Sequence, residues 1–130
     1  MKKMNKATYD SRFFVEFYYS KDQALRQKMA EKKRFKDRYV STIVIHEVYN
    51  LSLSKEGRDV AKLRAMSMKE EFQLIPVDDQ IAQVSAELRH KYRLSMGDSI
   101  IAATTSDLGA VLISDDPHFK QIKEIETTWI

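Results

Sequence analysis

Short apolar runs alternate along this chain with stretches in which apolar residues recur at helical spacing. The runs predict strands at residues 7–9, 38–40, 72–77, 110–113 and 125–130. Strands that alternate with helices indicate an α/β fold with a mainly parallel sheet.

The stretches between these runs predict helices with recognisable ends. One helix should begin directly after Asp10, and Ser41-Thr42 and Asp78-Asp79 are suited to begin later ones. Gly97 should open a further helix, and Gly109 is suited to end it. Helices are therefore expected from residue 11, over 23–35, from 43 through 51, over 56–72, 79–92 and 97–108, and briefly around 119–122.

The length of 130 residues is typical of one domain whose core needs no disulfides, so we expect a single domain over residues 1–130. The absence of cysteine excludes a disulfide framework, a zinc ribbon, an iron–sulfur site and a thiol nucleophile. The apolar stretch at 13–19 contains Glu16 and is far shorter than the roughly 20 residues of a membrane-spanning helix. No signal-peptide pattern follows the basic start, so a cytoplasmic protein is expected.

The net charge of +3 is distributed unevenly. Residues 1–38 carry 12 Lys/Arg and 5 Asp/Glu, a net charge of +7, whereas residues 39–130 carry a net charge of −4. Eight of the basic residues lie between Lys21 and Arg38. Two interpretations stay open: a solvated helix face, or a patch that faces the phosphates of a nucleic acid.

Four acidic residues stand out by their place in the predicted fold. Asp10 and Asp116 follow strands, at the carboxyl ends where parallel sheets carry their sites. Glu47 and Asp98 lie on otherwise apolar helices, where a lone carboxylate is costly to bury. Four carboxylates without basic neighbours in sequence are explained by a shared cation, and oxygen ligands suit Mg²⁺ or Mn²⁺.

Structural explanations also exist for single members of this set. Asp98 could begin a helix, favoured by the helix dipole, and Asp116 could be a helix N-cap. Asp10 could be a turn residue, whereas Glu47 on an apolar face has fewer such explanations. The combination is more informative than any one of the four.

The stretch from Met96 to Phe119, MGDSIIAATTSDLGAVLISDDPHF, resembles the C-terminal motif of PIN-domain nucleases. It resembles most closely the VapC-type toxin ribonucleases of toxin–antitoxin pairs. The first acidic residue of the family matches Asp10, followed by Ser11, and its helical glutamate matches Glu47 after Ser41-Thr42. The matching C-terminal positions are Asp98, Ile101-Ala102-Ala103, Val111-Leu112-Ile113, Ser114, Asp116 and Phe119.

Two positions depart from the family pattern. Arg12 stands where the family often has Asn, and it could pair with Asp10 or contact a substrate phosphate. Asp115 precedes Asp116, but the spacing to Phe119 favours Asp116 as the functional residue and leaves Asp115 exposed.

The resemblance implies a PIN-like three-layer α/β/α fold and endonucleolytic cleavage of RNA that depends on Mg²⁺ or Mn²⁺. The catalytic and metal-binding residues would be Asp10, Glu47, Asp98 and Asp116, and Ser114 would orient one of these ligands. A VapB-like antitoxin and a homodimer are further implications. The alternative is a non-catalytic PIN-like module that binds RNA or serves as a scaffold. Four basic residues are candidates for contact with the RNA backbone: Arg12, Lys32, Lys33 and Arg34.

Other functional sites are disfavoured by the sequence. His46, His90 and His118 have no zinc-ligand spacing and are interpreted as ordinary surface or core residues, although His118 follows Asp116 closely and could approach a phosphate. No phosphate-binding P-loop or dinucleotide-binding glycine pattern occurs. The aromatic residues before Arg38 exceed what one short helix can bury, which predicts an exposed apolar patch at a dimer interface. They are Phe13, Phe14, Phe17, Tyr18, Tyr19 and Phe35.

Overall fold

The computed structural model describes residues 5–32 and 35–129, with the side chain of Lys32 left out. Its centre is a five-stranded sheet in which every neighbouring pair is parallel, in the order β3-β2-β1-β4-β5. The prediction of a mainly parallel sheet is therefore confirmed. The strands are β1 (Lys6–Tyr9), β2 (Asp37–Ser41), β3 (Gln73–Ile75), β4 (Val111–Ile113) and β5 (Glu126–Thr128).

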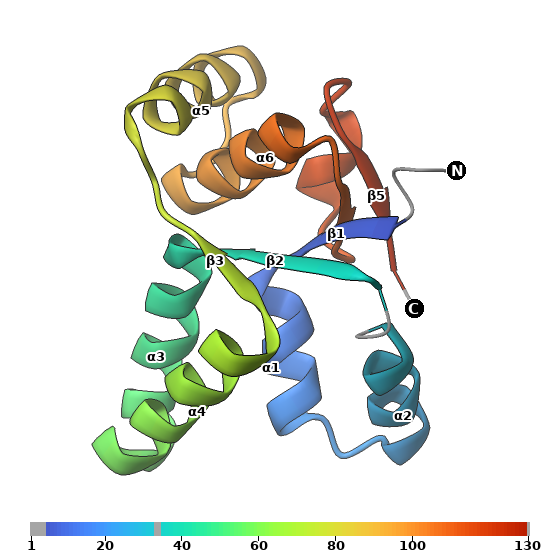
Figure 1. Ribbon diagram of the computed structural model, residues 1–130, viewed down its shortest axis with the longest axis vertical. Coiled ribbons are helices and arrows are strands. Elements are labelled where there is room, and N and C mark those ends of the chain that lie inside the picture. The colour runs from blue at the N-terminus through green and yellow to red at the C-terminus, as the bar shows by residue number, and fades with distance from the viewer. Residues whose placement is uncertain (1–4, 33–34, 130) are drawn as a thin grey trace.

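Helices cover both faces of the sheet, which gives the expected three layers (Figure 1). No helix in residues 5–32 and 35–129 combines the length and hydropathy needed to cross a membrane. On one face lie α1 (Ser11–Tyr19), α2 (Gln23–Lys32), α3 (Thr42–Glu56) and α4 (Arg58–Glu71). On the other lie α5 (Asp79–Tyr92) and α6 (Met96–Leu108), and a short 3-10 helix, η2 (Pro117–Gln121), follows β4.

The central strand β1 holds both helical layers in place, because its side chains alternate between the two faces. Thr8 forms a buried hydroxyl–hydroxyl hydrogen bond of 2.6 Å with Thr105, which fixes α6 against the sheet. Tyr9 points to the opposite side, where its ring packs edge-on against the rings of Phe13 and Phe72. The distances between ring centroids are 4.8 and 5.0 Å. The two contacts therefore hold the two helical layers against opposite faces of β1.

The predicted aromatic patch is not found among the described residues. Phe13 and Phe14 are buried, while Phe17, Tyr18 and Phe35 are half-buried and pack against the core. The prediction was wrong because it compared the aromatic residues with a single helix. Helices α2, α3 and α4 lie on the same face of the sheet as α1 and supply the missing packing surface (Figure 1).

Several predicted helices have different boundaries in the structure. Helix α3 continues to Glu56, beyond the predicted residue 51, and α6 begins at Met96, one residue before Gly97. The helix expected over 23–35 ends at Lys32, with residues 33 and 34 outside the described range. The helix expected over 56–72 starts at Arg58, because Gly57 adopts φ of 92° and separates it from α3. A residue with a side chain is strained at that φ, so glycine marks this break.

Candidate functional site

The acidic site lies at the carboxyl edge of the sheet, where β1 and β4 end side by side. Asp10 follows β1, and its backbone N–H donates to the carbonyl of Ile113 at 3.2 Å. Ser114 follows β4, donates to Asp10 Oδ2 at 2.7 Å, and accepts from the Asp116 N–H at 3.1 Å. Ser114 therefore joins the carboxylate after β1 to the loop after β4.

Asp10 is the most deeply buried acidic residue of the site, with 2% of its surface exposed. It stands at the N-cap position of α1, yet its side chain makes no capping hydrogen bond. Burial raises the pKa of Asp10 to about 6, and the nearby charges of Asp98 and Glu47 act in the same direction. The hydrogen bond from Ser114 opposes this increase in the pKa only in part.

Glu47 reaches the same region from α3. Its Oε1 atom is buried, and no hydrogen-bond partner for it exists among the described residues. Burial raises the pKa of Glu47, and the charge of Asp98 raises it further, while a hydrogen bond from Ser11 lowers it. A buried, unpartnered carboxylate oxygen is costly, which indicates that a ligand belongs beside it.

Gly97 provides the space that Glu47 occupies. A Cβ atom at Gly97 would lie 2.6 Å from Glu47 Oε2, closer than non-bonded atoms approach. The first turn of α6 and the carboxylate of α3 can therefore approach this closely only because residue 97 has no side chain.

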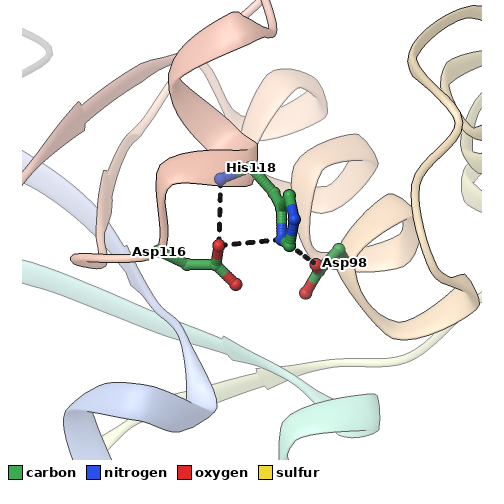
Figure 2. Close-up of side chains that lie close together, drawn as sticks. All are labelled: Asp98, Asp116 and His118. Atoms are coloured by element: carbon green, nitrogen blue, oxygen red, sulfur yellow. Dashed lines mark hydrogen bonds and ion pairs between the residues drawn. The ribbon is translucent and has the colours of Figure 1, made fainter.

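Asp98 and Asp116 face each other across the site, and His118 lies between them (Figure 2). The His118 Nδ1 atom is 3.0 Å from Asp116 Oδ1 and 3.9 Å from Asp98 Oδ2. One ligand atom from each of the three lies within 4.8 Å of the others. Asp116 Oδ1 also accepts from the His118 N–H at 2.9 Å, so Asp116 is the predicted N-cap as well as a member of the cluster.

The electrostatics of Asp98 show how crowded the cluster is. Burial raises the pKa of Asp98, the charge of Asp116 raises it further, and the nearby His118 lowers it. No Lys or Arg among the described residues forms an ion pair with any of the four acidic residues. Within this part of the chain, the negative charge of the cluster is therefore not balanced by a Lys or Arg side chain.

Three neighbours of these carboxylates were not assigned to the site from the sequence. The sequence favoured an ordinary histidine at position 118, and it indicated no role for Gly97 or Ser11 at Glu47. The position of His118, two residues after an acidic motif residue and next to Pro117, was the available signal.

Arg12 does not pair with Asp10. It donates two hydrogen bonds to Asp115, at 3.1 and 3.2 Å, and lies 3.8 Å from Glu16. Asp116 therefore lies close to Asp98. Asp115 lies at the edge of the site, where it forms an ion pair with Arg12. The two partners are 103 residues apart in sequence, so no local pattern could have indicated the pair.

The predicted RNA contacts of the basic run fall largely beyond the described residues. Lys33 and Arg34 lie outside them, and Lys32 is described only by its backbone. Helix α2 leads into the amino end of β2, whereas the acidic site lies at the carboxyl ends of the strands (Figure 1).

The donor set fits a hard divalent cation. Four carboxylates and one imidazole converge on one edge of the sheet, and oxygen-rich sites of this kind suit Mg²⁺ and Mn²⁺. The unpartnered Glu47 Oε1 and the raised pKa values of Asp10, Glu47 and Asp98 are the features that a bound cation would relieve.

The buried carboxyl of Asp10 predicts a pH dependence of stability in metal-free protein. Its pKa of about 6 exceeds the ordinary 3.8, so the folded state keeps this proton to higher pH than the unfolded state. Stability must then fall as pH rises through this interval, by about 2 kcal/mol between about pH 4.5 and pH 7.5 from Asp10 alone. Urea unfolding in EDTA at the two pH values measures it.

The matched variants separate Asp10 from other groups. Asp10→Asn should flatten this pH dependence and stabilise the metal-free protein at the higher pH. Asp107→Asn, which neutralises an exposed carboxylate on α6, should keep the full slope. Equal slopes in all three proteins would contradict the assignment to Asp10.

Comparison with known proteins identifies the family. No curated protein sequence matches the chain. Among solved structures, a chain of VapBC2 from Rickettsia felis bound to a promoter DNA fragment is 13% identical, with a TM-score of 0.78, covering 95% of this chain and 97% of that one. Mycobacterium tuberculosis VapC20, described as a toxin that cleaves the sarcin–ricin loop, is 18% identical, with a TM-score of 0.76 and coverage of 93% and 98%. A toxin–antitoxin complex from Klebsiella pneumoniae is 21% identical, with a TM-score of 0.75 and coverage of 96% and 100%. These similarities show the fold.

The family model of the PIN domain matches residues 8–125, so the chain belongs to the PIN domain family, the nuclease family that its C-terminal motif resembles.

Proposed function

We propose that this protein is an endoribonuclease that hydrolyses RNA phosphodiester bonds with Mg²⁺ or Mn²⁺, as the toxin of a VapBC-type pair. One observation carries the proposal: carboxylates from four separate segments meet at the carboxyl edge of the sheet, and none forms an ion pair with a described Lys or Arg. Membership of the PIN domain family supports nuclease chemistry at this point of the fold.

Asp10, Glu47, Asp98 and Asp116 would hold the cation, and Ser114 would orient Asp10 through its 2.7 Å hydrogen bond. A bound divalent ion activates water and neutralises negative charge on the phosphoryl oxygens. His118 adds a nitrogen ligand, which favours Mn²⁺ over Mg²⁺ because nitrogen donors bind Mg²⁺ poorly. Asp10, the most buried of the four, is the least accessible to the substrate.

The test of the proposed function is cleavage of a labelled single-stranded RNA. The expected result is endonucleolytic cleavage in Mg²⁺ or Mn²⁺, none in EDTA, and recovery when metal is returned. RNA binding without cleavage in any metal would favour the alternative of a non-catalytic RNA-binding or scaffold module.

Binding of metal should be measurable without RNA. Only the folded protein gathers the four carboxylates, so Mg²⁺ or Mn²⁺ should raise the melting temperature. Each kcal/mol of binding free energy raises it by about 3–5 °C for a domain of this size. The double variant Glu47→Gln/Asp98→Asn should show no such increase. An equal increase in wild type and double variant would place the bound metal elsewhere.

The partners are part of the same proposal. Solved relatives with this fold include VapBC2 from Rickettsia felis and FitAcB from Neisseria gonorrhoeae, and we infer a VapB-like antitoxin for this chain. The homodimer and the cytoplasmic location likewise stay predictions. Leu63 and Met66, three residues apart on α4 and 64% and 56% exposed, would support dimerisation in place of the buried aromatic residues.

A further inference from the structure

A groove between α5 and α6 adjoins the acidic site. Its volume is about 880 Å³, at the upper end of the roughly 300–1,000 Å³ of ligand pockets. Arg89, His90 and Arg93 line the side formed by the end of α5, and Leu94, Met96 and Ser99 line the other. Helices α5 and α6 cover the face of the sheet opposite α1 to α4 (Figure 1).

The groove is cationic, and its charge has no counterpart among the described residues. None of its lining residues is acidic. The side chains of Arg89 and Arg93 form no ion pair with any described residue, and the two lie four positions apart, where like charges repel. The helix dipole favours cations near the C-terminus of α5. Lys91, at the same end of the helix, forms an ion pair with Glu124 at 3.1 Å, whereas the two arginines form none with a described residue.

Arg93 has an unusual backbone for its residue type. It ends α5 with φ of 57° and ψ of 46°, the left-handed conformation that usually belongs to glycine. It is the only non-glycine residue with positive φ in the described part of the chain. A cationic side chain that lines the groove thus occupies a position where glycine would be less strained.

The groove reaches the first turn of α6, the helix that also carries Asp98. Met96 and Ser99 flank Asp98 on the first turn of α6, and the hydroxyl of Ser95 accepts a hydrogen bond from the Asp98 N–H at 3.2 Å. The exposed thioether of Met96, with Leu94 behind it, gives the groove an apolar surface beside its two arginines. A positively charged groove of this kind can follow the backbone of a single-stranded nucleic acid.

We propose that this groove binds the backbone of single-stranded RNA beside the cleaved phosphodiester, with Arg89 and Arg93 on phosphates. The inference rests on the proposed nuclease function and replaces the basic run near α2 as the main source of RNA affinity. Charge complementarity favours RNA: the acidic cluster repels the substrate backbone, and these arginines are cations without an ion pair among the described residues, close to Asp98 along the chain.

The experiment measures RNA binding without cleavage. A fluorescein-labelled single-stranded oligouridylate is titrated in EDTA, by anisotropy, at several salt concentrations. Arg89→Gln/Arg93→Gly removes both charges, and glycine at 93 suits the left-handed conformation, so the variant should melt no lower than wild type. Lys62→Gln/Lys69→Gln removes two exposed charges from α4 as the matched control.

The groove variant should bind RNA about tenfold more weakly, and its slope of log affinity against log salt should flatten by about 1.4, or about 0.7 for each phosphate that an arginine no longer neutralises. The α4 variant should keep both values. Equal affinity and slope in wild type and groove variant overturn the inference while leaving metal-dependent cleavage intact. Unchanged RNA binding together with weaker binding of poly-glutamate overturns it too, and assigns the groove to an acidic protein segment. Weakened RNA binding by the groove variant, in a protein that cleaves no RNA, upholds the groove and refutes the proposed function.

Discussion

Asp98→Asn should abolish metal-dependent RNA cleavage while leaving the protein folded. The change removes a charged oxygen from the centre of the cluster, next to Asp116 and His118. Loss of even an outer partner of a metal ligand costs 10–100-fold, so cleavage should fall by more than about 100-fold. Since burial and Asp116 both raise the pKa of Asp98, its neutral replacement relieves repulsion, and the metal-free variant should melt at or above the wild-type temperature.

Two control variants make this result specific. Asp107→Asn makes the same change at an exposed position of the same helix and should be fully active. Asp115→Asn breaks the ion pair with Arg12, which is at the rim and worth little, and should be nearly neutral. An active Asp98→Asn enzyme would refute the site, and an inactive Asp115→Asn enzyme would show that the assignment is one residue out of place.

Gly97→Ala should separate activity from stability. The new methyl group would lie 2.6 Å from Glu47 Oε2, so the carboxylate must shift away from residue 97. Metal affinity and RNA cleavage should both fall by about 10- to 100-fold. Alanine is the better helix former by roughly 0.5–1 kcal/mol, so the metal-free variant should melt at the wild-type temperature or higher. Titration calorimetry with Mn²⁺ and thermal unfolding measure the two effects.

The control is a glycine at the other end of the same helix. Gly109 has φ of 61°, and a Cβ there would meet nothing within 4 Å. Gly109→Ala should therefore lower the melting temperature through backbone strain and leave Mn²⁺ affinity unchanged. If both variants change metal affinity alike, the effect at Gly97 is not due to its contact with Glu47.

The sequence was sufficient for the architecture because each element carried its own signal. Apolar runs marked the strands, and Gly109 marked the end of α6 by a conformation that glycine favours. A break between the two helices was predicted, but it was placed between residues 51 and 56, whereas the structure has it at Gly57, where it depends on one backbone angle. Local patterns report the faces of helices better than their ends.

The candidate site was predictable for a topological reason. Parallel strands end at one edge, so residues after β1 and β4 must meet there even though they are far apart in sequence. The order of strands in the sheet does not determine which side chains of the helices and loops contact one another. The pairing of Arg12 with Asp115, and the approach of Glu47 to Gly97, depend on how helices pack and could be found only in three dimensions.

The pairing of β1 has a consequence for how the protein is made. Ala7 pairs with Arg38 on one side and with Val111 on the other, so one edge of the central strand gains its neighbour early in translation and the other edge gains it late. Until β4 leaves the ribosome, Asp10 has no hydrogen bond from Ser114, and Asp116 is not yet available. The nascent chain therefore carries an open strand edge, which is prone to pair with other chains. The acidic centre is therefore complete only after β4 and the segment that carries Ser114 and Asp116 have left the ribosome.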